Sequence, residues 1–395
     1  MEEQPFIGAT PGFFLTGGFF NGSMGGVVST PSILVSTTNL TFTDTVISTT
    51  SDYMTFTVSG TNLSTSIIVT CASGYQISLS PSSGYVTTTL TLPLSSGSVP
   101  ATIIYVQAIP LLPQEYLGAI TCSSTGATTR NVMVDVFGVY DPDAILYFNQ
   151  LTGVVPQNYK VSISYFVTGV KSDGNWPSVS GAGGRMFIHA APNQQNARIS
   201  ISNPTSNPIT EINGVAWTQY QGYTGANLTW LDYNYVPTTE GVNKNSWGFS
   251  IYPLLNQSSD LSYIFGGVSG SVPNRCETRL ILNYTAFGKS YNVNAEILPE
   301  TQLANTVTSG FFTVIRTASN AQAIWLNGSS IGTSSKASNG TPASKLLGLA
   351  YNNGGSGQGV FFSTNQIALT FMHDGALDIA KMNTRVASLK AEIGF

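Results

Sequence analysis

The side chains that could hydrolyse a glycosidic bond are carboxylates, and the chain contains eleven of them after residue 160. Glycoside hydrolysis needs two carboxyl groups beside the scissile bond, one as the acid and one as the base or nucleophile. The eleven carboxylates are Asp173, Glu211, Asp232, Glu240, Asp260, Glu277, Glu296, Glu300, Asp374, Asp378 and Glu392. They are scattered along the sequence, and no spacing among them predicts that two would meet across a substrate.

The two histidines, His189 and His373, are the other side chains that could bind a metal or act as a base. Neither has a Cys or a second His at the spacing of a zinc site, so we interpret each as a hydrogen-bonded surface or core residue. No Gly-x-Ser-x-Gly nucleophile elbow lies between a strand and a helix. We therefore predict a protein that is not an enzyme, with no metal and no cofactor.

Sugar binding is the small-ligand function that the sequence supports best. Aromatic rings can stack on sugar rings, while Asn, Gln and Asp side chains bind hydroxyl groups, and one stretch rich in Asn, Gln and Thr supplies both kinds. The candidate glycan contacts are Tyr220, Tyr223, Asn227, Asp232, Tyr233 and Tyr235. For Trp217 and Trp230, in the same stretch, we favour core positions, because large aromatic side chains are mostly buried. We expect tyrosines on loops to be the exposed ones.

The composition narrows the function further. Only 9% of the 395 residues are charged and 42% are hydrophobic, which excludes a disordered chain. The net charge of −4 disfavours a general nucleic-acid binder. The charges are also uneven: residues 1–159 contain one basic and eight acidic side chains, a net charge of −7, whereas the remainder contains fourteen basic and eleven acidic ones, a net charge of +3. This change predicts a domain boundary near residue 140.

The first residues and the cysteines indicate whether the protein is expected to be secreted, inserted in a membrane or stabilised by disulfides. Glu2 and Glu3 stand where a secretory signal would carry basic residues, and no run approaches eighteen apolar residues. We therefore expect neither a signal peptide nor a membrane span. The three cysteines, Cys71, Cys122 and Cys276, cannot form a closed set of disulfides. Cys71 and Cys122 could face each other, but we interpret them as small buried side chains.

Residues 1–30 combine many glycines with five phenylalanines. These are Phe6, Phe13, Phe14, Phe19 and Phe20. A glycine-rich backbone is flexible, yet five phenylalanines are costly to leave in water. The segment is therefore expected to be an arm that docks on another surface. The alternative is a strand that covers the edge of one of this protein's own sheets.

Residues 31–139 break into short strand-like pieces at a spacing of near ten residues. Alternation is clear where Met54, Phe56 and Val58 share one face, and residues 132–136 repeat it with Val. About seven such strands with no helical period are typical of an immunoglobulin-like β-sandwich. Its exposed Thr and Ser side chains would suit a neutral spacer.

Residues 140–395 contain all five tryptophans and many strands at wider spacing, which predicts a two-sheet jelly roll. A helix-compatible run precedes these strands, around residues 163–170. The clearest helix is C-terminal, at residues 378–393, where Ile379, Met382, Val386, Leu389 and Ile393 recur at helical spacing after Asp378 as N-cap. We favour a helix lying on its own domain over a coiled coil.

A resemblance supports the N-terminal assignment. Four segments fall in order: Phe56-Thr-Val-Ser-Gly-Thr-Asn-Leu63, Gly74-Tyr-Gln-Ile-Ser78, Ile104-Tyr-Val106 and the segment 116–126. Together they resemble an immunoglobulin-like module that is common in surface proteins of Bacteroidota and in their phages. That module often has Arg after the Tyr-Val pair, where this chain has Gln107.

A second resemblance spans nearly all of residues 140–395. Its motifs are Lys171-Ser-Asp-Gly-Asn-Trp176, Gly222-Tyr-Thr-Gly-Ala-Asn227, Trp230-Leu-Asp232, Pro237, Phe311-Phe-Thr-Val-Ile-Arg316, Ile324-Trp-Leu-Asn-Gly328 and Phe361-Phe-Ser363. In this order they resemble the concanavalin-like jelly-roll domain found in structural proteins of tailed phages that infect Bacteroidota, including crAss-like phages. Glucanases of related fold carry a Glu-x-Asp-x-x-Glu triplet, which this chain lacks.

The resemblance implies a non-enzymatic protein at the virion surface, made in the host cytoplasm. It would be a head fibre or decoration protein, or a short tail appendage, that displays a carbohydrate-binding domain for adhesion to the host. The implied partners are capsid or tail proteins, bound through residues 1–30, a second or third copy of the chain, and a host-surface glycan. The alternatives are a bacterial surface lectin or adhesin and a polysaccharide-degrading enzyme.

Overall fold

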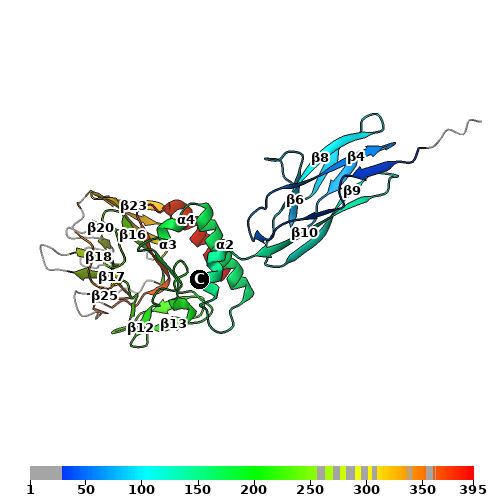
Figure 1. Ribbon diagram of the computed structural model, residues 1–395. Coiled ribbons are helices and arrows are strands. Elements are labelled where there is room, and N and C mark those ends of the chain that lie inside the picture. Colours follow the sequence, from blue (N-terminus) through cyan, green and yellow to red (C-terminus); the bar gives the residue numbers. More distant parts are fainter. Residues whose placement is uncertain are drawn as a thin grey trace, which may run out of the picture.

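The computed structural model (Figure 1) describes residues 29–255, 263–269, 276–281, 290–294, 301–304, 309–335, 337, 340–352, 359–360 and 362–395. Strands dominate these residues and form four sheets, two in the first part of the chain and two in the second. The prediction of an all-β fold, with one sandwich followed by a larger two-sheet domain, is confirmed.

The first part is a two-sheet sandwich, called the N-terminal sandwich below. One sheet has the order β1-β4-β8-β6, and the other has the order β2-β10-β9-β5-β7 with β3 beside β10. The strands are β1 (Ser32–Val35), β2 (Asn39–Thr41), β3 (Thr45–Val46), β4 (Met54–Thr61), β5 (Ile67–Thr70), β6 (Tyr75–Ser78), β7 (Thr89–Leu92), β8 (Val99–Ala108), β9 (Glu115–Ser123) and β10 (Arg130–Val139).

The two-residue alternation of the sequence explains this sandwich. Phe56 and Val58 of β4 and Val132 and Val134 of β10 are buried, while the residues between them point outward. Cys122 is fully buried and Cys71 is half-buried, and both are free thiols. Because the buried side chains of the two sheets form one core, this domain is stabilised independently of the remainder of the chain.

The second part contains two larger sheets and is called the C-terminal domain. One has the order β13-β14-β27-β16-β21-β22-β23 with β11 beside β27, and the other has the order β12-β15-β24-β17-β18-β19-β20 with β25 and β26. The first set comprises β11 (Arg185–Ile188), β13 (Ala216–Thr218), β14 (Gly222–Thr224), β16 (Trp247–Leu255), β21 (Phe312–Ala318), β22 (Ala321–Leu326), β23 (Ser329–Ser334) and β27 (Gln366–Asp374). The second comprises β12 (Thr210–Ile212), β15 (Trp230–Asp232), β17 (Tyr263–Ser269), β18 (Cys276–Ile281), β19 (Ser290–Asn294), β20 (Thr301–Ala304), β24 (Leu347–Gly348), β25 (Tyr351–Asn352) and β26 (Gly359–Val360).

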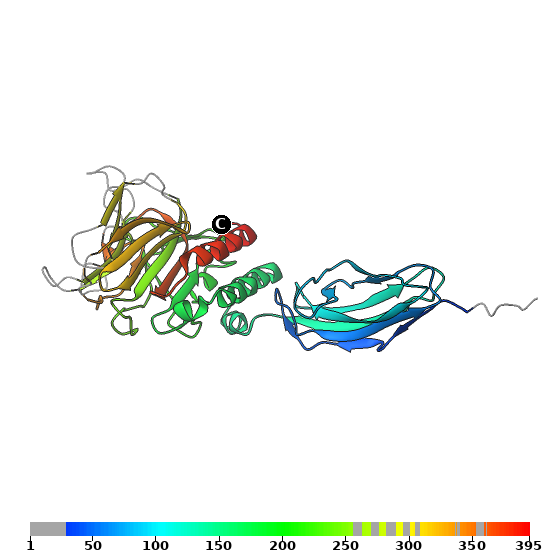
Figure 2. The same ribbon diagram turned by 90° about the horizontal axis from the view of Figure 1, so that it is seen from above.

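Helices add a third layer to this domain. They are α1 (Pro142–Phe148), α2 (Gln157–Ser172), α3 (Trp176–Ser180), a short 3-10 turn (Asn196–Arg198) and α4 (Ile379–Ile393). α2 and α4 lie side by side on the face of the first sheet that is turned toward the N-terminal sandwich (Figures 1 and 2). Phe166 of α2 packs against Phe371 of β27, with ring centroids 6.3 Å apart. The central strand β27 is therefore buried on both faces.

The C-terminal helix is confirmed. Its predicted N-cap Asp378 accepts a hydrogen bond from the backbone N–H of Lys381, and Gly394 ends the helix in the left-handed conformation. Met382 and Val386 are buried, so the helix lies on its own domain. Besides this helix, α1, α2 and α3 are helical, and α2 contains the run predicted to be compatible with a helix. None of the helices in the described ranges has the length and apolar character needed to cross a bilayer.

Candidate functional site

Three of the predicted glycan-binding tyrosines are core residues, which corrects the sequence-based site. Tyr223, Tyr233 and Tyr235 are at most 2% exposed. Their hydroxyl groups are used inside the protein: Tyr223 bonds to the carboxylate of Glu211, Tyr233 lies 2.8 Å from the Thr370 hydroxyl, and Tyr235 donates to a backbone carbonyl at 2.6 Å. Burial raises the pKa of all three phenols. Their rings therefore present no face to a sugar.

The other predicted contacts do not form a common site. Asp232 is buried, and its carboxylate accepts hydrogen bonds from the Asn234 N–H at 2.8 Å and from Lys345 Nζ at 2.6 Å. Tyr220 is half-buried against the core, and of the six residues only Asn227 is exposed. The candidate attachment residues Phe6, Phe13, Phe14, Phe19 and Phe20 lie outside the described residues.

Both histidines are buried parts of hydrogen-bond networks. His189 contacts the Ala197 carbonyl and the Thr370 hydroxyl, each at 3.1 Å. His373 lies 3.1 Å from the Ser250 hydroxyl and 2.8 Å from the Asp374 carbonyl oxygen. Burial lowers the pKa of each imidazole to about 4, so both are neutral at pH 7. Across the residues that can be described, no three His, Cys, Asp or Glu side chains gather in a metal-binding group.

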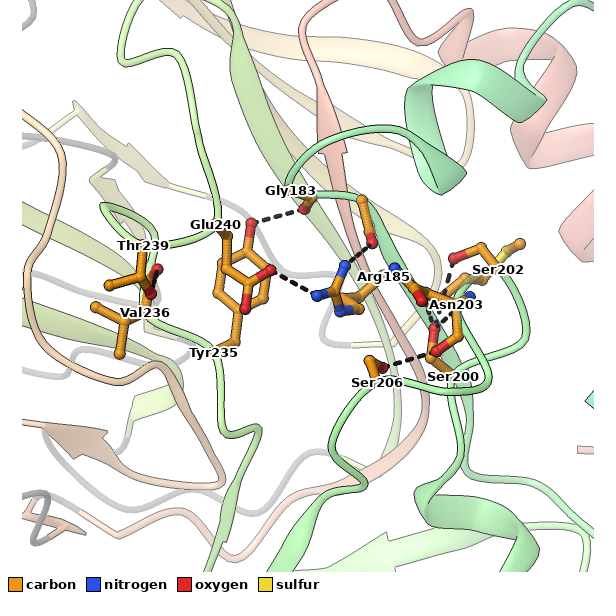
Figure 3. Close-up of polar contacts among 12 residues, drawn as sticks. Gly183, Arg185, Ser200, Ser202, Asn203, Ser206, Tyr235, Val236, Thr239 and Glu240 are labelled. Carbon is orange, nitrogen blue, oxygen red and sulfur yellow. Dashed lines mark hydrogen bonds and ion pairs between the residues drawn. The ribbon is translucent and has the colours of Figure 1, made fainter. Parts of the chain in front are cut away.

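A polar cluster beside β11 has a structural role (Figure 3). Arg185 Nη2 pairs with the Glu240 carboxylate at 2.5 Å, Nη1 donates to the Gly184 carbonyl at 2.7 Å, and the guanidinium lies over the Tyr235 ring. Nearby, the Ser200 hydroxyl accepts hydrogen bonds from two backbone N–H groups (Figure 3). Because these donors and acceptors are used within the chain, the cluster joins β11 to its neighbouring loops and does not provide an open binding site.

The junction between the two domains is fixed by Asp141, which follows β10 and begins α1. Its carboxylate caps the helix by accepting the Asp143 N–H at 2.9 Å and binds Lys171 Nζ at 2.5 Å. Its own N–H donates to the Ser164 hydroxyl at 2.8 Å. Asp141 is only 4% exposed, so these contacts satisfy a buried charge. They hold the connection between the domains against α2.

A second set of contacts crosses the junction. Tyr165 of α2 donates its hydroxyl hydrogen to the carbonyl of Leu111, in the loop between β8 and β9. The Tyr116 hydroxyl holds this loop by accepting the N–H groups of Leu111 and Leu112, at 3.0 and 2.8 Å. The loop is thus anchored on both sides, and the two domains are linked at a point separate from the chain connection.

Between these contacts lies a cleft of about 520 Å³, the candidate functional site. The N-terminal sandwich contributes Ser48, Thr49, Thr50, Ile109 and Leu111 to its wall, and the helices contribute Tyr165, Thr168, Gly169, Ser172 and Arg385. A smaller hollow of about 180 Å³ shares Ser48, Tyr165 and Arg385 with it. Binding sites of this size are frequent at domain interfaces. Hydroxyl groups dominate the polar part of the wall.

Arg385 is the charged group of the cleft, and α2 holds it in place. Its Nε and Nη2 atoms bond to the two carboxylate oxygens of Asp173, at 2.7 and 2.9 Å. This pairing lowers the pKa of Asp173 and raises that of Arg385. A Cβ atom on Gly169 would lie 2.8 Å from Arg385 Cδ, so the glycine lets the guanidinium lie on the helix backbone. Nη1 has no hydrogen-bond partner among the described residues and can donate to a ligand.

Comparison with known proteins gives no family. No family model and no curated protein matches the chain. Solved structures similar to it include Trypanosoma rangeli sialidase with 2,3-difluorosialic acid (TM-score 0.39, 7% identity, 70% of this chain and 43% of that one) and the same sialidase with sialic acid (TM-score 0.39, 8% identity, 91% and 53%). A structure concerning botulinum neurotoxin type C and two ganglioside molecules has a TM-score of 0.38 and 12% identity, over 53% of this chain and 52% of that one. The chain thus spans about half the length of these proteins.

This comparison contradicts the prediction that the chain is not an enzyme, because the first solved structures that it returns are sialidases. The prediction is withdrawn. Identities near 7% and TM-scores below 0.5 are too low to assign sialidase chemistry, or any other activity, to this chain.

Proposed function

We propose that this chain is a surface protein of a tailed-phage particle, either a head fibre or decoration protein or a short tail appendage. The proposal rests on the order of the domains along the length of the molecule. β1 begins at the end of the N-terminal sandwich farthest from the C-terminal domain (Figures 1 and 2). A chain attached through residues 1–30 would therefore present the C-terminal domain outward, which is what the resemblance to phage structural proteins leads us to expect.

The junction supports this display role. Two side chains of α2 contact the rest of the junction. Lys171 pairs with Asp141 in the segment that joins the two domains, and Tyr165 bonds to the Leu111 carbonyl of the N-terminal sandwich. Two separate anchor points restrict the angle between domains more than a single flexible linker would. The N-terminal sandwich then acts as a spacer that sets both the distance and the direction of the outer domain.

We further propose that a host-surface glycan binds in the cleft at the junction. The hydroxyls of Ser48, Thr50 and Thr168 can exchange hydrogen bonds with sugar hydroxyls, and the Tyr165 ring and Ile109 supply apolar surface. Arg385, held by Asp173, adds a charged donor to the wall of the cleft. This site replaces the six residues proposed from sequence, most of which are buried.

Particle imaging tests the attachment. Deleting residues 2–28 should leave both domains folded but prevent incorporation of the protein into particles. Electron microscopy of purified particles and analysis of the proteins they contain measure this incorporation. A full-length chain supplied in the same way is the control. Normal incorporation of the truncated chain would contradict attachment through this segment.

A glycan array with the full-length chain tests the cleft. Thr50→Trp places a large ring in the cleft, whereas Thr43→Trp makes the same change at another exposed threonine of the N-terminal sandwich. We expect at least one glycan to bind the wild type and Thr43→Trp and to lose at least tenfold in affinity for Thr50→Trp. Equal binding by all three proteins, or no binding by the wild type, would refute glycan recognition at this cleft.

A further inference from the structure

The outer face of the sheet β1-β4-β8-β6 is the feature of the N-terminal sandwich that the spacer role leaves unexplained. Strand register pairs Thr57 with Ile103 and Thr55 with Tyr105, while the intervening residues point into the core. Leu34 of β1 lies opposite Ser59 of β4, on the outward side. We call this outward side the uncharged face, because β1, β4, β6 and β8 contain no Asp, Glu, Lys or Arg.

Several large side chains on the uncharged face, or directly beside it, are exposed. Leu34 is 62% exposed, and Tyr53 and Ile103 are each 48% exposed. The Tyr53 and Tyr105 rings meet edge to face with centroids 5.2 Å apart. Beside them, Gln107 accepts a hydrogen bond from the Gln76 amide at 2.8 Å. The face therefore presents aromatic, aliphatic and neutral polar groups without charge, and charged residues are likewise depleted in the core of protein interfaces.

The distribution of charged residues favours this face, rather than the outer face of the second sheet, for contact between identical chains. The second sheet also exposes apolar side chains, with Leu117 at 67% and Met133 at 48%. However, its register places Leu117 opposite Asp135 and Phe137 opposite Glu115. Since residues 1–159 carry a net charge of −7, two copies meeting at that sheet would bring carboxylates together. The uncharged face avoids this repulsion.

We propose that two copies of this chain associate through their uncharged faces around a two-fold axis. Sheets that pack face to face keep their strands roughly aligned, and their side chains interdigitate. The four strands have 4, 8, 10 and 4 residues, which at about 3.3 Å per residue and about 4.8 Å between strands cover about 400 Å² of sheet per copy. Two such faces bury about 800 Å² before the flanking residues such as Tyr53 are counted, so we expect a weak dimer that forms at micromolar rather than nanomolar concentration. The proposal does not depend on glycan binding in the cleft.

Light scattering after size-exclusion chromatography, with a dilution series of the full-length chain, tests the dimer. We expect the wild type to reach twice its chain mass of 41.8 kDa at micromolar concentration. Ile103→Glu should weaken association at least tenfold, because it places one carboxylate of each copy in the apolar interface. Met133→Glu is the matched control, since it changes a residue of equal exposure on the other sheet and should leave association unchanged.

A second variant guards against a folding defect in β8. Tyr53→Glu changes a residue outside the strands and should also weaken association at least tenfold, with the thermal unfolding of the wild type retained. A wild type that remains monomeric at 100 μM refutes the dimer. If both face variants associate like the wild type, or if Met133→Glu weakens association as much as they do, the interface lies elsewhere and the proposal is wrong.

Discussion

Acidification should unfold the C-terminal domain before the N-terminal sandwich, because both histidines of the chain lie in the C-terminal domain. Burial lowers the pKa of His189 and His373 from 6.5 to about 4. The folded domain therefore favours the neutral imidazoles, while the unfolded chain protonates them near pH 6.5. Below pH 6.5 the unfolded state binds more protons, so the free energy of unfolding falls as the pH falls, until about pH 4.

The size of the effect follows from the two pKa values. At pH 5 each histidine should lower the free energy of unfolding by about 2 kcal/mol relative to pH 7, and the pair by about 4 kcal/mol. A domain stability of about 5–15 kcal/mol makes this a large fraction of the total. Asp173 adds little to this change between pH 7 and 5, because its pKa is lowered by its pairing with Arg385 and the carboxylate protonates only in stronger acid.

Urea unfolding at pH 7, 6 and 5, followed by tryptophan fluorescence, measures the effect. All five tryptophans lie after residue 175, so their fluorescence reports the C-terminal domain alone. His373→Gln should remove about half of the pH dependence while keeping a hydrogen-bonding side chain beside Ser250. A free energy of unfolding that differs by less than 1 kcal/mol between pH 7 and 5 would show that these imidazoles are not held neutral by burial.

Three further substitutions test the contacts of the helices, each followed by thermal unfolding of the C-terminal domain. Gly169→Ala should lower the free energy of unfolding by about 1 kcal/mol, because the new Cβ displaces Arg385 and this outweighs the better helix propensity of Ala. An increased stability would contradict the close contact between Gly169 and Arg385. Asp378→Ala should cost about 1 kcal/mol through loss of the N-cap, and an unchanged midpoint would argue against that cap. Lys171→Met should cost about 2 kcal/mol, since it leaves Asp141 buried without its cation, and Asp141→Asn in addition should recover part of that loss.

The N-terminal sandwich could be predicted from the sequence because its signal is local. Phe56 and Val58 alternate with threonine or serine, and Val132, Val134 and Val136 alternate with outward-facing residues, so each strand has one buried and one exposed face. Such a pattern needs no knowledge of distant residues. The predicted strand segments therefore lie close to the observed β4 and β10.

The strands of the C-terminal domain have a weaker sequence pattern than those of the N-terminal sandwich, because the central sheet is covered on both faces. β27 lies between the second sheet and the helices, so its residues are buried without alternation. For the same reason the tyrosines of the 220–235 stretch were misplaced. Flanking Asn, Thr and Gly residues indicate loops, but these short strands and turns direct Tyr223, Tyr233 and Tyr235 into the core. The proximity of these segments to β27 is a tertiary property that no local pattern encodes.

The candidate cleft was not predictable for a related reason. Its wall combines Thr50, Leu111, Thr168 and Arg385, which belong to four segments separated by up to 335 residues. None of these segments carries a motif, since single Ser and Thr residues in turns have many roles. The pairing of Asp173 with Arg385 and the anchoring of the Leu111 loop are tertiary contacts that bring these segments together.

The two proposals together constrain how a dimer would be oriented. The strands of the N-terminal sandwich run along its length (Figure 2), so a two-fold axis parallel to them places both C-terminal domains at the same end. An axis perpendicular to the strands would place those domains at opposite ends, and only one chain could then present its outer domain away from a particle. Attachment through residues 1–30 thus requires the parallel axis. Negative-stain images of the isolated dimer should show two large lobes at one end and the narrow sandwiches at the other, and lobes at opposite ends would make the dimer and the attached form mutually exclusive.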